Sequence, residues 1–370
     1  MRFFNACRLL SLLAFISPLV TTILASYPYY PLPIRYIHQW PIPWYIQSLY
    51  VRDNGDIMVT TVWPIASVWV LTDVLTDAPQ ATLIYKFDQV NATTAITETE
   101  PDVFAIIGAN QTSLGVGIDG DQSIWELDLR PGNGSYTEGF TIKEIIHLSE
   151  AGLCGSLVQL PKDPSILLLA DTHKGVIWRV DTRAHTYELA AREEHMDWLP
   201  WFITEFGISG VKIQDGYLYW TLSYAATIWR IAISDDGFPL PGAKPEEVKW
   251  IRSVFLDNFA FASRDNATIF AALNADNRLV AIDKHGEPTY VAGTPDEMIL
   301  LGPTTPAFGK VRGDTNTVYV VTCGAILNPI NGTTFEGGRI VAIDTTAFFE
   351  QYLSEEPEPE LELRSEDGRS

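Results

Sequence analysis

Three side chains in the sequence are suited to proton transfer or hydrogen bonding at neutral pH: those of His173, Asp257 and Tyr224. The imidazole of His173 can donate or accept a proton near neutrality. Asp257 can orient that imidazole or accept a proton directly, and the phenol of Tyr224 can donate a hydrogen bond to a substrate oxygen. Two of them also fit structural roles, since His173 lies in a D-x-H-x-G turn and Asp257 can cap a turn. We interpret all three as candidate catalytic residues.

Metal-binding and disulfide patterns are weak in this sequence. No zinc site is expected, because no metal-ligand spacing links His38, His147, His185, His195 and His285. Removal of a leader over residues 1–25 would leave Cys154 and Cys323, which are too few for a disulfide scaffold. The repeat described next places these two cysteines on opposite sides of a channel, so we expect free thiols.

A seven-residue pattern that recurs six times indicates the elements that must position these residues. Its copies have apolar third, fourth and sixth positions, and they are TLIYKFD (82–88), QSIWELD (122–128), GVIWRVD (175–181), ATIWRIA (226–232), NRLVAID (277–283) and GRIVAID (338–344). Successive copies end 40 to 61 residues apart, a period typical of a four-stranded blade. The Asp that ends five copies is expected to bind turn amides. The repeated Trp125, Trp178 and Trp229 are expected in the core.

Further strands complete each repeat. A second apolar run precedes most copies, as in residues 56–62 and 165–171, and turns such as Asp53–Gly55 suit tight hairpins. We therefore predict an all-β, six-bladed β-propeller of four-stranded antiparallel blades over residues 26–353. The segment 34–40 is expected to supply the outer strand of the last blade and close the ring, and residues 345–353 are expected to form a short helix.

Alignment of the repeats nominates two rings of residues at one mouth of the channel. The first ring is Gln47, Cys154, Ser209, Asp257 and Thr305, with Glu98 assigned to the irregular second blade. The second ring is Trp63, His173, Tyr224, Asn274 and Cys323. The predicted substrate-binding residues are Gln47, Trp63, Cys154, Ser209, Asn274, Thr305 and Cys323. Apolar walls are expected from Trp63, Trp69, Trp198, Trp201 and Phe202, with residues 196–202 as a lid.

Composition and the chain ends bear on location and partners. With 46 acidic against 25 basic residues the net charge is −21, which disfavours nucleic-acid binding. Arg2, Arg8 and the apolar run 9–24 predict a signal peptide over residues 1–25, with a single membrane anchor as the alternative. We expect no membrane span after cleavage, a monomer in the secretory pathway or outside the cell, and a disordered acidic tail over 354–370. Five sequons are candidate glycosylation sites: Asn91, Asn110, Asn133, Asn266 and Asn331.

Several segments resemble the gluconolactonase and senescence-marker-type six-bladed propellers in their secreted fungal form. They are 44–60, 153–181, 208–221 and 257–261, and LLLAD…GVIWRVD is the most specific. That family commonly holds one divalent cation, often Ca²⁺, on a Glu, one or two Asn and an Asp. Here Gln47 stands at the Glu place and Cys154 and Ser209 at the Asn places, so only Asp257 remains. The resemblance therefore implies no metal cofactor, and a residual Ca²⁺ at Asp257 is disfavoured.

The signal peptide, the sequons and the altered metal positions also resemble fungal hetero-Diels–Alderases that act on small, apolar or aromatic natural products. That resemblance implies loss of water from a hydroxymethyl tropolone or phenol, followed by cycloaddition of the quinone methide with an alkene such as humulene. His173 and Asp257 would move the protons, while Tyr224, Ser209, Gln47 and Thr305 would bind the substrate oxygens. The alternatives are a Ca²⁺-dependent lactonase and a non-catalytic binding propeller.

Overall fold

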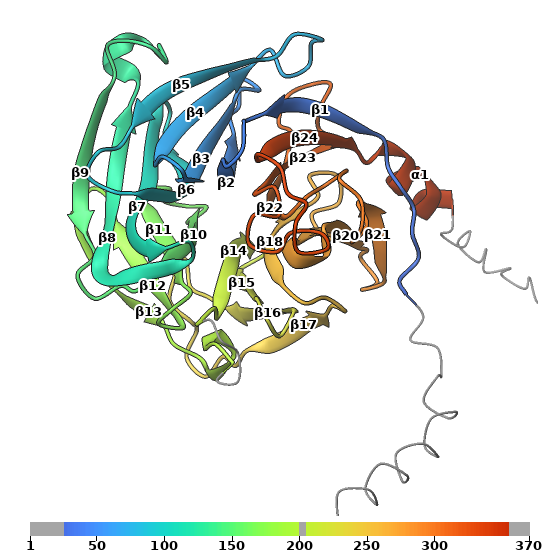
Figure 1. The fold of residues 1–370 in the computed structure, drawn as a ribbon. Coiled ribbons are helices and arrows are strands. Elements are labelled where there is room, and N and C mark those ends of the chain that lie inside the picture. Colours follow the sequence, from blue (N-terminus) through green and yellow to red (C-terminus); the bar gives the residue numbers. More distant parts are fainter. Residues whose placement is uncertain (1–25, 200–204, 355–370) are drawn as a thin grey trace, which may run out of the picture.

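The computed structural model describes residues 26–199 and 205–354, and these form a ring of six four-stranded antiparallel sheets. Figure 1 shows the sheets arranged as blades around a central axis. This confirms the predicted six-bladed β-propeller. The expected signal peptide, Trp201, Phe202 and residues 355–370 of the expected tail lie outside the described residues.

The first three blades follow one another along the chain, each running from the axis outward. Blade one contains β2 (Tyr45–Val51), β3 (Ile57–Trp63), β4 (Ser67–Thr72) and β5 (Gln80–Lys86). Blade two contains β6 (Ala92–Glu100), β7 (Val103–Ser113), β8 (Val116–Asp128) and β9 (Thr141–His147). Blade three contains β10 (Cys154–Gln159), β11 (Ile166–Asp171), β12 (Val176–Asp181) and β13 (Thr186–Ala191).

The last three blades repeat this order, except that the final outer strand comes from the start of the chain. Blade four contains β14 (Ile208–Gln214), β15 (Tyr217–Leu222), β16 (Thr227–Ala232) and β17 (Glu246–Trp250). Blade five contains β18 (Leu256–Phe261), β19 (Ile269–Leu273), β20 (Arg278–Ile282) and β21 (Pro288–Ala292). Blade six contains β22 (Pro303–Phe308), β23 (Thr317–Thr322), β24 (Arg339–Asp344) and β1 (Ile34–Gln39).

The ring is closed by β1, which pairs antiparallel with β24 from Ile34 opposite Ile343 to Gln39 opposite Arg339. Figure 1 shows this blue strand lying against the red end of the chain. The pairing confirms the closure predicted for residues 34–40, and it covers the edge that β24 would otherwise expose. The expected short helix is also present, as α1 (Thr346–Ser354).

The predicted repeat holds in five blades and fails in the first. In blades two to six the heptad forms the third strand, but TLIYKFD of blade one falls on the outer strand β5. The third strand there is β4, which is mostly buried, whereas β5 has a single buried residue. The terminal Asp has its expected role: Asp181 accepts hydrogen bonds from the Arg183 and Ala184 amides at 2.9 and 2.8 Å.

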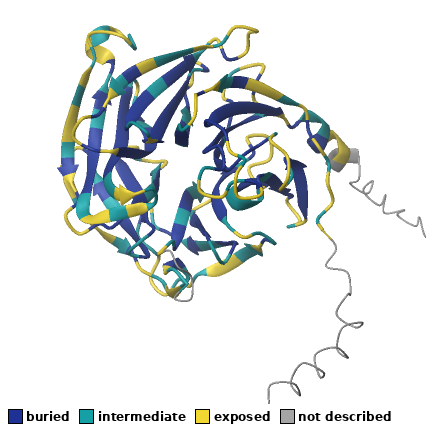
Figure 2. Ribbon diagram, viewed as in Figure 1, coloured by how far each residue is buried: buried dark blue, intermediate teal, exposed yellow. Residues whose placement is uncertain are grey.

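The core lies between the inner strands of adjacent blades. Figure 2 shows buried residues concentrated on the strands near the axis and exposed residues on the outer strands and loops. Trp125 and Trp178 are buried in two of the core clusters, as predicted. Trp229 is partly buried and packs against a third core cluster. No helix within residues 26–199 or 205–354 is both long enough and apolar enough to cross a membrane.

Candidate functional site

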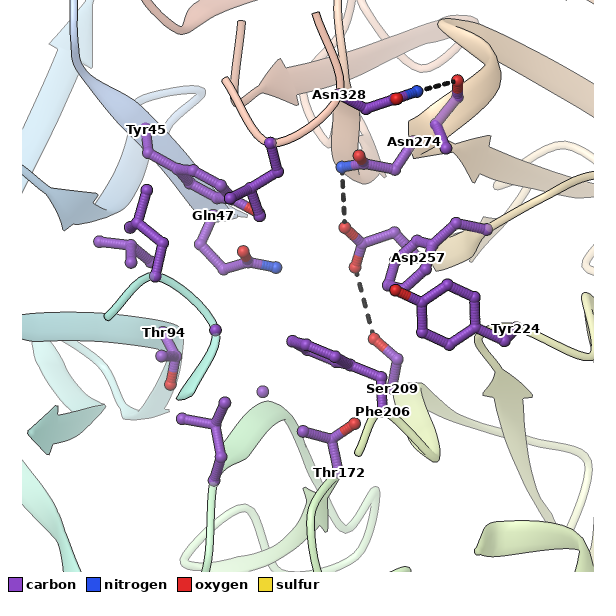
Figure 3. A pocket seen from close by; sticks show the side chains of 18 of the residues that line it. Tyr45, Gln47, Thr94, Thr172, Phe206, Ser209, Tyr224, Asp257, Asn274 and Asn328 are labelled. Atoms are coloured by element: carbon purple, nitrogen blue, oxygen red, sulfur yellow. Dashed lines mark hydrogen bonds between the residues drawn. The ribbon is translucent and has the colours of Figure 1, made fainter. Parts of the chain in front are cut away.

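A cavity of about 380 Å³ occupies one mouth of the central channel. It is lined by the starts of the inner strands and by loops that follow the second strands, as the alignment of the repeats predicts. Figure 3 shows Gln47, Ser209 and Asp257 converging on it from different blades. A cavity of this size, lined by both polar and apolar residues, is suited to a small molecule.

A β-bulge on each inner strand turns these residues into the channel. The register shifts fall between Ile46 and Ser48 in β2 and between Leu256 and Phe259 in β18, with corresponding shifts in β6, β10, β14 and β22. A bulge leaves a residue outside the strand ladder and redirects its side chain. Gln47 and Asp257 lie within the first two shifts, and both line the cavity.

Asp257 is the charged residue at the centre of the site. Its side chain is 5% exposed, and its carboxylate accepts hydrogen bonds from Ser209 Oγ at 3.4 Å and Asn274 Nδ2 at 3.2 Å. Burial raises the pKa of Asp257 to about 7, although hydrogen bonds from Ser209, Asn274 and Gln47 oppose that shift. The group can therefore be an acid or a base at neutral pH.

An aromatic cluster forms the wall beside Asp257. The Phe206 ring meets those of Tyr224 and Phe255 edge to face, with centroids 6.5 and 5.9 Å apart, and Tyr224 meets Phe255 at 5.0 Å. All three residues line the cavity. Tyr224 is thus placed at the site, as predicted, with its ring fixed by two phenylalanines.

The long hairpin of β7 and β8 reaches over the mouth and supplies Leu114 and Gly115 to the lining. Gln111 Oε1 accepts a hydrogen bond from the Gly115 amide at 2.9 Å, which fixes the tip of the hairpin. His173 Nε2 lies 3.3 Å from the Gly115 carbonyl oxygen, and its ring meets the edge of Phe206 at 6.1 Å. His173 therefore lies behind this tip, next to the cavity lining instead of within it.

Four of the predicted residues meet around Asp257, and others do not. Gln47, Ser209, Tyr224 and Asn274 line the cavity with it. Trp63 is 45% exposed and is not among the lining residues. Thr305 is buried and donates through Oγ1 to the Gln47 carbonyl at 2.7 Å, so it supports the strand that carries Gln47.

The cysteines and Glu98 are corrections to the predicted rings. Cys154 and Cys323 are both buried free thiols, and neither lines the cavity. The bulge of β10 presents Gly155 to the cavity, one residue beyond Cys154. In blade two the lining residue is Thr94; Glu98 instead accepts a hydrogen bond from the Asp102 amide at 2.8 Å.

The predicted tryptophan walls are also placed elsewhere. Trp69 is partly buried and packs edge to face against Trp40 and Trp44, with centroids 5.9 and 5.6 Å apart, beside the core cluster between blades six and one. Trp198 is partly buried and is not among the lining residues. The apolar surface comes instead from residues that the sequence analysis did not nominate: Tyr45, Val62, Leu114, Leu153, Phe206, Val254, Phe255 and Leu327.

The oxygen donors around Asp257 are a poor set for Ca²⁺. That ion takes six to eight oxygen ligands, commonly with several carboxylates. Here there is one carboxylate, and Asn274 directs its Nδ2 toward it instead of an oxygen. Across residues 26–199 and 205–354 no three His, Cys, Asp or Glu side chains gather as a metal site. The residues present therefore do not fit a calcium ion.

The sequons lie on the surface of the blades. Asn91, Asn133, Asn266 and Asn331 are exposed, and Asn110 is partly buried. The Asn91 Nδ2 donates to the Gln111 carbonyl at 2.8 Å. Glycosylation at these five residues stays a prediction.

Comparison with known proteins gives two kinds of similarity, although no family model matches the chain. A Sarocladium schorii protein named "Putative hetero-Diels-Alderase asR5" is 29% identical, and the match covers 86% of this chain and 85% of that one. A Phoma sp. protein named "Putative hetero-Diels-Alderase" is 29% identical over 78% of this chain and 86% of its own.

Solved structures agree in fold at much lower identity. A luciferin-regenerating enzyme matches with a TM-score of 0.59 and 9% identity, covering 85% of this chain and 95% of its own. A calcium-binding regucalcin from Agrobacterium tumefaciens matches with a TM-score of 0.55 and 11% identity, covering 86% and 97%. A structure titled "putative gluconolactonase" gives 0.55 and 11%, covering 86% and 96%. The chain is thus a six-bladed propeller that shares its fold with these solved structures and is similar in sequence to two proteins named hetero-Diels–Alderases.

Proposed function

We propose that this protein is a hetero-Diels–Alderase that acts on small apolar or aromatic natural products without a metal ion. The supporting observation is a buried carboxyl group with a pKa of about 7 in a cavity that also presents aromatic rings. The names of the two sequence relatives point to the same reaction. The poor oxygen-donor set around Asp257 supports a metal-independent mechanism.

The first step is loss of water from a hydroxymethyl tropolone or a related phenol. Protonated Asp257 donates its proton to the leaving hydroxyl, the carbon–oxygen bond breaks, and water departs. The proton on the ring oxygen then passes to the Asp257 carboxylate, which regenerates the acid and leaves a neutral quinone methide. Gln47, Ser209 and Asn274 lie beside this carboxyl group, where they can bind the substrate oxygens.

The second step is cycloaddition of the quinone methide with an alkene such as humulene. One carbon–carbon and one carbon–oxygen bond form from the π electrons of the two partners, with no proton transfer. The protein's contribution is to hold both reactants in contact and away from water. The Phe206, Tyr224 and Phe255 cluster, together with Leu114 and Leu153, supplies apolar surface for the alkene.

The test is incubation of the purified protein with a hydroxymethyl tropolone and humulene, with and without a chelator. We expect faster formation of one stereoisomer of the adduct, unchanged by chelation. Asp257→Asn should lower the rate about 100-fold or more, in line with the loss of a general acid. The control Asp296→Asn changes an exposed carboxylate and should leave the rate unchanged.

Three outcomes would contradict the proposal. Absence of any acceleration would favour a non-catalytic binding propeller. Hydrolysis of a sugar lactone that is lost on chelation and restored by Ca²⁺ would favour the lactonase. An active Asp257→Asn variant would remove Asp257 from the proton transfers.

Location and partners follow from the same proposal. We infer a monomer of the secretory pathway that binds small molecules and not nucleic acid. The apolar run 9–24 and the sequons support the location, and the net charge of −21 disfavours nucleic acid.

A further inference from the structure

A second cavity, of about 320 Å³, lies at the opposite end of the channel. The same inner strands line both cavities: β2 gives Gln47 to the first and Tyr50 to the second, and β18 gives Asp257 to the first and Phe261 to the second. All six blades contribute to the second cavity. It is therefore a separate hollow that the proposed reaction does not use.

The second cavity differs from the rest of the protein in charge. Its lining contains two lysines, Lys212 and Lys310, and no Asp or Glu. The whole chain has 46 acidic residues against 25 basic ones, so a lining whose charged residues are all basic is unusual for this protein. Such a hollow concentrates positive potential within an otherwise acidic molecule.

Lys212 is the inner charge of this cavity. Its Nζ donates to the Asn258 Oδ1 at 3.0 Å and to the Val211 carbonyl at 3.1 Å, and it lies 5.6 Å from the centre of the Phe259 ring. These neighbours are neutral, and in the described part of the chain no carboxylate lies at ion-pairing distance from it. Burial lowers the pKa of Lys212 to about 8, with no opposing effect from an acidic group.

The acceptor of Lys212 is itself held in place. Asn258 Nδ2 donates to the Ser156 Oγ at 3.2 Å, which directs the Asn258 carbonyl oxygen toward the ammonium group. An ammonium group has three N–H donors, and two are used here. The third hydrogen and the uncompensated charge remain for a ligand.

Lys310 adds a second charge in the lining. Its Nζ contacts the Tyr50 hydroxyl at 3.1 Å and the exposed Asp53 carboxylate at 3.2 Å. An ion pair with an exposed partner is weak, so Lys310 can exchange it for a stronger anion.

We propose that this end of the channel binds a small oxyanion, a phosphate or carboxylate group, with Lys212 as its charge partner and Lys310 as a second contact. The anion supplies the negative charge that the Lys212 neighbours lack and accepts its third hydrogen. A charge-assisted hydrogen bond of this kind is stronger than a neutral one.

The test is calorimetric titration of the full chain with inorganic phosphate and, separately, with acetate. We expect saturable binding of at least one of them, and the pair distinguishes the two oxyanion types. Lys212→Met, which keeps the apolar stem and removes the charge, should weaken binding at least about tenfold. Lys143→Met removes an exposed lysine of the outer strand β9 and should bind as the wild type does.

If the Lys212→Met variant does not fold, a second measurement on the wild type still tests the proposal. The bound anion should protect Lys212 from reductive methylation, as read by mass spectrometry, while Lys143 stays reactive. Absence of binding by both anions, equal binding by Lys212→Met, or equal methylation of Lys212 with and without the anion would overturn the proposal. None of these measurements depends on the cycloaddition activity.

Discussion

The carboxyl group of Asp257 is buried, and its hydrogen-bond partners Gln47, Ser209 and Asn274 are all neutral. Among the residues that the structure describes, no cation pairs with it, so desolvation exceeds the effect of the hydrogen bonds and the proton is retained up to about pH 7. The same burial that suits the residue to proton transfer makes its ionised form costly. Asp257 should therefore affect stability as well as activity.

This cost gives a pH-dependent prediction for Asp257→Asn. The folded pKa of about 7 lies above the ordinary value of 3.8, so between those pH values the folded protein binds more protons than the unfolded one. The Asp257 contribution to stability is then full below about pH 4 and is lost as the pH rises to 7. The free energy of unfolding of the variant, minus that of the wild type, should rise across this window by as much as about 4 kcal/mol.

Urea unfolding at intervals from pH 4 to 8 measures this difference, in which titrations common to both proteins cancel. Asp296→Asn serves as the control, since that residue is exposed, and its difference from the wild type should stay flat with pH. A flat difference for Asp257→Asn would show that its pKa is not raised in the folded protein.

At the scale of the strand, the bulges of the inner strands decide which residues reach the cavity. In β10 the bulge presents Gly155, whose added Cβ would meet nothing within 4 Å. In β14 the bulge contains Gly210, whose added Cβ would lie 2.5 Å from Asn258 Oδ1 and 2.8 Å from Asn258 Cα. Two glycines on adjacent blades thus face different surroundings.

These surroundings predict that the same substitution changes stability by different amounts at the two positions. Gly155→Ala should change the free energy of unfolding by less than about 1 kcal/mol, whereas Gly210→Ala should lower it by about 1–3 kcal/mol, because the neighbouring backbone must move. Gly155→Val should raise the KM for the substrate by narrowing the cavity, with little change in Tm. Thermal unfolding compares all three variants, and steady-state kinetics measures the KM of Gly155→Val. Similar destabilisation by the two alanines would contradict this view of the bulges.

The bulges also explain how far the site could be predicted. Apolar spacing and the terminal Asp located the strands and placed Gln47, Ser209, Tyr224, Asp257 and Asn274 at one mouth. The apolar residues on either side of a bulge do not mark which residue it adds, so the alignment nominated Cys154, whereas Gly155 lines the cavity.

Other differences have equally local causes. TLIYKFD has the heptad pattern but forms an outer strand, because a mixed apolar and polar segment also suits a half-exposed edge. The hairpin tip at residues 111–120 has three glycines and only three apolar residues, so its composition did not indicate that it extends two strands over the cavity.

At the scale of the whole molecule, β1 contributes to the contacts that join distant parts of the chain into a ring. Ile37 of β1 is 6% exposed and packs in the same core cluster as Ile340 of β24 and Ile46 of β2. It thus takes part in the packing of the last blade against the first. Loss of this contact should destabilise the entire ring.

Ile37→Ala should lower the free energy of unfolding by about 2–4 kcal/mol, the usual cost of truncating a buried Ile. The neighbouring Tyr36→Ala is the control, because Tyr36 is 54% exposed and its main contact is a cation–π interaction with Arg339 at 4.6 Å. That variant should lose about 1 kcal/mol or less. Urea unfolding measures both values, and limited proteolysis should show earlier cleavage in Ile37→Ala. Equal losses in the two variants would mean that β1 covers the edge of β24 without holding the ring closed.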